Sequence, residues 1–172
     1  MMNETAQSPA REFAVLVPIL DHEGEECVLL TQRSGTIGRY AGQVCLPGGE
    51  RDPEDATLED TALRETWEEV GILRDRVTII RELAWHLSSV LHRVKPFVGH
   101  VHKPYELRPN PREVERIIFV PTAMITPALF RIRGTWKGPD GHEHAVHTFP
   151  WDGCEVWGLT ARILREAFLK TG

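Results

Sequence analysis

The chain has 172 residues, of which 41% are hydrophobic and 26% are charged. These values are typical of a folded, water-soluble protein and exclude a disordered, collagen-like or coiled-coil chain, while the length suits one compact domain. Its 20 Lys and Arg residues against 25 Asp and Glu residues give a net charge of −5. This balance argues against a broad basic surface, so nucleic acid is not an expected partner.

The sequence carries no signal for a membrane or for secretion. Its longest apolar run covers residues 13–20, far short of the roughly 20 residues that span a bilayer. Because the N-terminus lacks the basic start and apolar segment of a secretory signal, we expect a cytoplasmic protein. The three cysteines are never spaced as CxxC and predict reduced thiols, with neither a disulfide framework nor a thiolate zinc site. For the oligomeric state, a monomer and a homodimer are both compatible with the sequence.

The N-terminal part of the chain is predicted to form strands. Residues 1–11 are polar and predicted to be flexible, which leaves residues 12–172 as a single domain. Two runs rich in Val, Ile and Leu, residues 13–20 and 27–32, are predicted to be strands joined by a hairpin connection. Residues 33–41 contain Gly, Ser and Arg without a period and are predicted to form an exposed loop.

A helix is predicted within residues 46–72, with Asp55 or Thr57 as its N-cap and Gly71 as its left-handed stop. After it we predict strands at residues 77–83, 95–102 and 116–121, a hairpin of 129–137 with 142–149, and a closing helix with an apolar stripe from Leu159 to Phe168. Strands, helix, strands and helix in this order predict an α+β or layered α/β domain.

Three carboxylates mark one face of the first helix. At about 100° per residue, Glu65, Glu68 and Glu69 fall within an arc of about 100°. Like charges at this spacing destabilise a helix by a few tenths of a kcal/mol per pair, and a hard divalent cation relieves the repulsion. We therefore predict a Mg²⁺ or Mn²⁺ site; the alternative is a solvated acidic face.

The core-facing stripe of this helix is predicted to contain Ala62, Leu63, Thr66, Trp67 and Val70. Ahead of the helix, the paired glycines Gly48 and Gly49 allow the backbone to approach a ligand closely and to point a carbonyl at a metal. We expect both glycines to contact substrate and Gly49 to contribute to the metal site.

Together, loop and helix resemble the signature of the Nudix hydrolases, G-x5-E-x7-R-E-U-x-E-E-x-G-U, in which U is aliphatic. The matching residues are Gly49, Arg64, Glu65, Glu68, Glu69, Gly71 and Ile72. Three features differ from the signature. Asp55 replaces the first Glu, Arg64 follows Gly49 by one residue more than usual, and Thr66 replaces an aliphatic residue.

This resemblance implies an α/β/α sandwich, with a mixed sheet flanked by helices, and hydrolysis of a nucleoside diphosphate linked to another moiety. It implies that the metal is held by Glu65, Glu68 and Glu69, and that Arg64 orients a catalytic carboxylate through a charge-assisted pair. Family members also use an acid from outside the helix, for which Glu113 and Glu115 are the two candidates in this sequence.

Two further segments, residues 29–34 and 42–49, resemble the coenzyme A pyrophosphatase branch, with the pattern LLTxRS-x3-R-x3-G-x3-F-PGG. Gly38 replaces the Arg of this pattern, although Arg39 is adjacent, and Leu46 replaces its Phe. Residues 156–164 and 110–114 are similar to other parts of the same branch.

The branch resemblance implies cleavage of coenzyme A or acyl-coenzyme A to adenosine 3′,5′-bisphosphate and 4′-phosphopantetheine or its acyl derivative. Arg33 and Arg39 are then the expected partners of the substrate phosphates, since guanidinium groups bind phosphate through two hydrogen bonds. Two alternatives are a pyrophosphatase for ADP-ribose or another nucleotide sugar, and a non-catalytic module of Nudix fold that binds a nucleotide.

Overall fold

The computed structural model describes residues 11–35, 41–88, 92–138 and 141–169. Its elements in chain order are β1 (Glu12–His22), β2 (Glu25–Arg33), β3 (Val44–Cys45), β4 (Gly48–Glu50), α1 (Leu58–Val70), η1 (Arg74–Arg76), β5 (Val77–Glu82), β6 (His86–Leu87), β7 (Arg93–Val101), β8 (Val114–Pro121), η2 (Thr122–Met124), η3 (Pro127–Leu129), β9 (Arg131–Lys137), β10 (Glu143–Trp151), β11 (Cys154–Trp157) and α2 (Gly158–Phe168). The predicted flexible segment lies outside the described residues except for Arg11.

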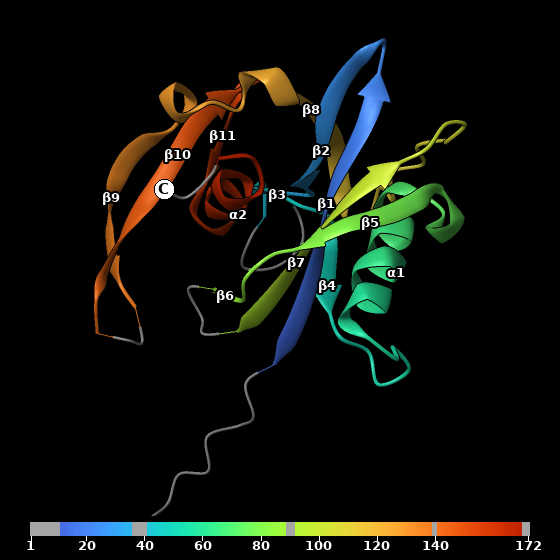
Figure 1. The fold of residues 1–172 in the computed structure, drawn as a ribbon, viewed down its shortest axis with the longest axis horizontal. Coiled ribbons are helices and arrows are strands. Elements are labelled where there is room, and N and C mark those ends of the chain that lie inside the picture. The colour runs from blue at the N-terminus through green and yellow to red at the C-terminus, as the bar shows by residue number, and fades with distance from the viewer. Residues whose placement is uncertain (1–10, 36–40, 89–91, 139–140, 170–172) are drawn as a thin grey trace, which may run out of the picture.

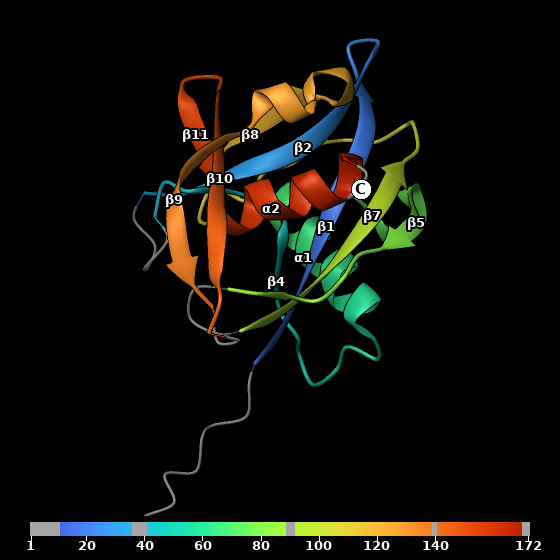
Figure 2. The ribbon, with the colours of Figure 1, turned by 60° about the vertical axis from the view of Figure 1, so that its left-hand side comes forward.

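The centre of the fold is a mixed sheet with the order β3-β2-β1-β7-β5, to which β4, β6 and β8 are added by pairing with β1, β7 and β2. β1 and β7 run parallel, whereas the other pairs in this sheet are antiparallel. A second, antiparallel sheet has the order β11-β10-β9. α1 lies on one side of the large sheet, and α2 lies between the two sheets (Figures 1 and 2). The predicted α+β fold with helices on both sides of a mixed sheet is confirmed.

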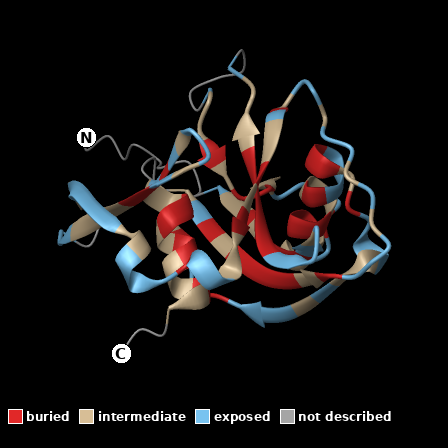
Figure 3. Ribbon diagram, turned by 90° about the horizontal axis from the view of Figure 1, so that it is seen from above, coloured by how far each residue is buried: buried red, intermediate tan, exposed pale blue. Residues whose placement is uncertain are grey.

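The sequence of β1 is a continuous apolar run because the strand is covered on both faces. Ala14 and Leu16 pack in a cluster with residues of α1, whereas Val17 and Ile19 point to the opposite face and pack in the cluster that contains α2. Successive side chains of a strand alternate between faces, so a strand covered on both sides has to be apolar at nearly every position. The burial pattern in Figure 3 follows these inner faces of sheet and helices.

α1 begins and ends at predicted signals. Thr57 is the N-cap and forms a capping box with Asp60, and Gly71 ends the helix in the left-handed region at φ 81°. Asp55, the other predicted cap, instead binds Arg64. The prediction that Trp67 belongs to the core-facing stripe is wrong, because this residue is 53% exposed. It lies at the edge of that stripe, about 100° around the helix from Thr66.

Four short strands were not predicted: β3, β4, β6 and β11. The Pro-Gly-Gly segment, expected as a loop, contains β4, which pairs with β1. Strands of two to four residues have too few alternating positions to show a period. The hairpin of β9 and β10 is confirmed, and the three cysteines are free thiols. No helix in the described part of the chain is long and apolar enough to cross a membrane.

The core between the two sheets depends on α2. Leu164 is fully buried there, and we expect Leu164→Ala to lower the free energy of unfolding by roughly 2–5 kcal/mol, because it leaves a cavity. Leu73→Ala is the matched control, since Leu73 is 52% exposed and its truncation leaves no cavity. Urea denaturation of both variants measures the difference; equal losses would contradict this view of the core.

Candidate active site

A cavity of about 570 Å³ opens where the two helices, the β3–β4 segment and the small sheet meet. Its polar lining includes Glu65 and Glu69 from α1, Glu113 from the residue before β8, and Arg33 from the end of β2. The backbone of Gly48 and Gly49 forms part of the same wall. The structure thus brings together residues that lie up to 80 positions apart in the sequence.

Glu69 is the most deeply buried acid of this group, with 3% of its surface exposed. Burial raises its pKa to about 8, and the nearby charges of Glu65 and Glu113 add to the rise, whereas Arg33 and a hydrogen bond with the Gly48 backbone oppose it. Burial likewise raises the pKa of Glu65. Negative charge at this end of the cavity is therefore costly unless a cation neutralises it.

Gly48 and Gly49 lie so close to neighbouring atoms that neither position has room for a side chain. A Cβ atom on Gly49 would overlap the carboxylate of Glu65, and a Cβ atom on Gly48 would overlap the backbone of Ala14. A larger residue at position 49 would displace the Glu65 carboxylate, and one at position 48 would displace the backbone of β1.

The two glycines present their backbones differently. Leu16 donates to Pro47 O, and Arg51 donates to Glu12 O, so Gly49 faces Ala14 in the bonded pair between them. Its carbonyl is directed at β1. Gly48 instead has its backbone hydrogen bond with Glu69. This differs from the expectation that Gly49 presents a carbonyl to the metal, and favours Gly48.

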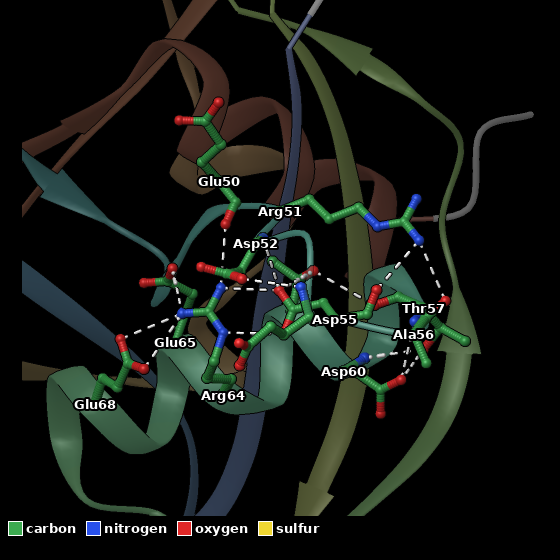
Figure 4. A network of polar contacts seen from close by, with 12 residues as sticks. Glu50, Arg51, Asp52, Asp55, Ala56, Thr57, Asp60, Arg64, Glu65 and Glu68 are labelled. Atoms are coloured by element: carbon green, nitrogen blue, oxygen red, sulfur yellow. Dashed lines mark hydrogen bonds and ion pairs between the residues drawn. The ribbon is translucent and has the colours of Figure 1, made fainter.

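Arg64 joins the loop before α1 to the carboxylates (Figure 4). Its Nε and Nη2 donate to the two oxygens of Asp55 over 3.0 and 2.9 Å, and its Nη1 donates to Glu65 over 2.9 Å. Nη2 also donates to the carbonyl of Glu50 over 3.1 Å. Arg64 does not line the cavity, and it acts on the site by fixing the orientation of Glu65.

Asp55, at the position where the signature has Glu, is the anchor of this network. Its carboxylate also accepts hydrogen bonds from Thr61 Oγ1 over 2.8 Å and from the Asp52 backbone N–H over 2.9 Å. The hydrogen bonds from Arg64, more than any other interaction, lower the pKa of Asp55 to about 2. The shorter side chain therefore still makes a bidentate pair with Arg64.

The third helix carboxylate is placed apart from the other two. The Glu68 side chain is 41% exposed and pairs with Arg64 Nη1 over 3.3 Å, and it does not line the cavity. On the helix it is about 100° from Glu69 and lies opposite the buried stripe. Among the described residues, no three His, Cys, Asp or Glu side chains are already arranged to hold one ion. The carboxylates have to turn toward a common point to do so.

Outside the helix, the structure distinguishes between the two acid candidates. Glu113 lines the cavity, and its Oε1 accepts a hydrogen bond from Asn110 Nδ2 over 3.0 Å. Glu115 is exposed and lies outside the cavity lining. Of the two predicted phosphate-binding arginines, Arg33 lines the cavity and Arg39 lies outside the described residues.

The sequence analysis missed the opposite wall of the cavity. This wall contains Leu87, His92, Trp136, Trp157 and Arg162, which come from the β6–β7 region, the small sheet and α2. Trp157 and Arg162 lie within residues 156–164, which the sequence analysis matched to the coenzyme A branch without assigning any of these residues to a site. No periodicity or motif spacing marks the β6–β7 region as part of a site.

Comparisons with known proteins point to one domain family. The NUDIX domain family matches residues 10–136. The chain is similar to the uncharacterized Nudix hydrolase NudL of Photorhabdus laumondii, with 37% identity over 91% of this chain and 82% of the relative. The NudL protein of Yersinia enterocolitica is 38% identical over 89% of this chain and 77% of its own length.

Solved structures show the same fold at lower identity. A Caenorhabditis elegans Ap4A hydrolase in a binary complex has a TM-score of 0.55 and 22% identity, covering 64% of this chain and 80% of the other. The NUDIX domain of Shewanella oneidensis NrtR, complexed with ADP ribose, has a TM-score of 0.53 and 20% identity, covering 72% and 80%.

The Arg64–Asp55 pair has a testable pH dependence. The folded-state pKa of Asp55, about 2, lies below its ordinary value of 3.8, so its ionised form stabilises the fold above about pH 4 and this contribution is lost as the pH falls toward 2. We expect Asp55→Asn to cost roughly 2 kcal/mol of unfolding free energy at neutral pH and little near pH 2.

Denaturant unfolding at several pH values checks this expectation. Asp75→Asn is the control, because the Asp75 side chain is 72% exposed and its ionisation contributes little to stability. A loss of stability in Asp55→Asn that is the same at pH 7 and at pH 2.5 would show that the charge is not responsible.

Proposed function

Because the chain belongs to the NUDIX domain family, we propose that it hydrolyses the diphosphate bond of coenzyme A or acyl-coenzyme A. Hydrolysis of a nucleoside diphosphate derivative is the activity that the family supports. The products would be adenosine 3′,5′-bisphosphate and 4′-phosphopantetheine or its acyl derivative. We place the enzyme in the cytoplasm, as a monomer or homodimer, with a small nucleotide as its partner.

The observation that carries this proposal is the buried acidic end of the cavity. Glu65, Glu69 and Glu113 line it together, and burial raises the pKa of both helix residues. Burying several carboxylates lowers the stability of the fold, which suggests that they have a function. Carboxylate oxygens are suitable ligands for a divalent cation, and such a cation in turn binds the oxygens of a diphosphate. Glu65 and Glu69 would hold Mg²⁺ or Mn²⁺ there, and the chemistry that such a cation would supply is neutralisation of phosphate charge and activation of water.

The residues of the chain then have separate roles. Glu65 and Glu69 bind the cation, Glu68 turns from Arg64 to complete the set, and the Gly48 backbone lies beside them. Arg64, anchored by Asp55, keeps Glu65 in place.

Glu113 is the proposed base. Its Oε1 is occupied by Asn110, so Oε2 accepts the proton of the attacking water. Asn110, which donates to Oε1, would then orient the base.

Arg33 is the proposed partner of the substrate phosphates at this end, with Arg39 as the second. Its charge lies close enough to lower the pKa of Glu69, which places it beside the carboxylates where a diphosphate would bind. The apolar walls of the remaining cavity, among them Leu46, Val146 and Leu159, suit a large organic group such as a nucleoside or pantetheine.

Two other functions have specific support. Gly38 and Leu46 depart from the coenzyme A pattern, and the NrtR domain of similar fold binds ADP ribose, which favours an ADP-ribose or nucleotide-sugar pyrophosphatase. The shifted signature and Thr66 favour a non-catalytic nucleotide-binding module. Retention of all three helix carboxylates argues for catalysis.

A hydrolysis panel tests the proposal. Purified protein is incubated with Mg²⁺ or Mn²⁺ and with coenzyme A, acetyl-coenzyme A, ADP-ribose and a nucleotide sugar, and the products are identified by mass spectrometry. We expect the highest kcat/KM for coenzyme A or its acyl derivative. A preference for ADP-ribose would replace the proposed substrate, and no metal-dependent cleavage of any compound would leave only the binding module.

Glu69→Gln tests the acidic end directly. The substitution keeps the shape of the side chain but removes the negative charge, so we expect kcat to fall by roughly two or more orders of magnitude. Glu59→Gln is the matched control, since Glu59 is in the first turn of the same helix and outside the cavity lining. Similar activity of the two variants in a metal-dependent assay would reject the assigned role of Glu69.

Gly49→Ala tests the close approach of β4 and α1. The added methyl group would overlap the end of the Glu65 side chain, which is able to move, so we expect a folded protein with kcat reduced by roughly tenfold or more. Gly134→Ala is the control, because a Cβ atom there meets no neighbour within 4 Å. Thermal unfolding and activity are measured together; a folded Gly49→Ala enzyme with full activity would contradict the constraint.

A further inference from the structure

The cavity has an electropositive end as well as an acidic one. Arg162 lines it from α2, whereas Glu65 and Glu69 line it from α1, and the two helices lie on opposite sides of the large sheet (Figure 1). Arg162 therefore enters the cavity from a different helix than the carboxylates proposed to hold the cation. It also lies beyond residue 136, where the match to the NUDIX domain family ends.

Arg162 is held in a fixed position by two hydrogen bonds. Its Nε donates to His86 Nδ1 over 3.1 Å, and its Nη2 donates to the carbonyl of Leu87 over 2.6 Å. Because a guanidinium group only donates, His86 accepts at Nδ1 and carries its proton on Nε2, which lies 2.7 Å from Glu166 Oε2. Burial and the charge of Arg162 lower the pKa of His86, in keeping with a neutral ring.

These contacts give Arg162 no charged acceptor, although the negative charge of Glu166 raises the pKa of Arg162 against the effect of burial. Neither of its acceptors is an anion, and Glu166 contacts the far nitrogen of the His86 ring. Burial lowers the pKa of Arg162, as expected for a cation that has lost water. Within the described part of the chain, Nη1 donates no hydrogen bond, so two N–H groups of a fixed, partly desolvated cation are left for a ligand.

We propose that Arg162 binds a phosphomonoester of the substrate, a phosphoryl group carried by the nucleoside apart from the diphosphate that is cleaved. This inference rests on the proposed hydrolysis of nucleoside diphosphate derivatives, because among such compounds a second phosphoryl group is the anion that a guanidinium group recognises through paired hydrogen bonds. Trp136, whose ring centroid lies 5.8 Å from the Arg162 guanidinium, forms part of the same wall. Arg162 is then a residue that determines specificity rather than rate.

Coenzyme A and 3′-dephospho-coenzyme A differ only in such a group and therefore test the proposal. We expect the wild-type enzyme to prefer coenzyme A in kcat/KM by roughly 10- to 100-fold, the effect of one charge-assisted contact. In Arg162→Gln the ratio should fall close to one, and in Arg162→Lys it should be intermediate. Arg165→Gln is the control on the same helix, since Arg165 does not line the cavity, and should keep the wild-type ratio.

Three results would overturn the proposal: no preference in the wild type, an unchanged ratio in Arg162→Gln, or an equal loss for both substrates in that variant. If the wild type cleaves neither compound, the proposed function fails. The role of Arg162 is then tested separately, by calorimetric measurement of nucleotide binding. Adenosine 3′,5′-bisphosphate should then bind the wild type at least about tenfold more tightly than AMP, and Arg162→Gln should lose this difference. Equal binding of both nucleotides by the wild type would overturn the proposal there too.

Discussion

The closeness of α1 to β4 is the constraint on which the site depends. The helix packs so near the strand that there is no room for a side chain between Gly49 and the Glu65 carboxylate. The same approach buries Glu69 against the Gly48 backbone and raises its pKa to about 8. Close packing against the two glycines thus desolvates part of an acidic helix face, and desolvation makes the negative charge of these carboxylates costly unless a cation neutralises it.

The short distance between α1 and β4 also depends on the loop that joins them, residues 51–57, being held in place. Arg64 holds this loop by binding Asp55, the carbonyl of Glu50 and the Glu65 carboxylate with one guanidinium group. Its planar fork binds both oxygens of Asp55 in a fixed geometry while it donates to the other two acceptors, and a lysine ammonium group has no such bidentate geometry. Arg64 lowers the pKa of Asp55, whereas burial raises the pKa of Glu69 and the charge of Arg33 offsets this rise only in part.

Local signals in the sequence were sufficient for much of this. Thr57 and Gly71 set the ends of α1, and the apolar run of β1 indicated a strand covered on both faces. Helical spacing alone placed Glu65, Glu68 and Glu69 on one face, but it could not show that Glu69 is buried and Glu68 exposed. That difference depends on which side of the helix meets the sheet, and it is decided by tertiary packing.

The wall that contains Arg162 could not be predicted for a related reason. Its residues come from α2, the small sheet and the β6–β7 region, which are far apart in the sequence, and the branch pattern in residues 156–164 does not show which side chains face a cavity. Residues 10–136, which match the family, include every carboxylate assigned to the chemistry. The segment beyond them supplies the His86-bound arginine and much of the apolar wall. If the proposed roles hold, substrate choice would change through α2 while the proposed metal-binding end of the cavity stays the same.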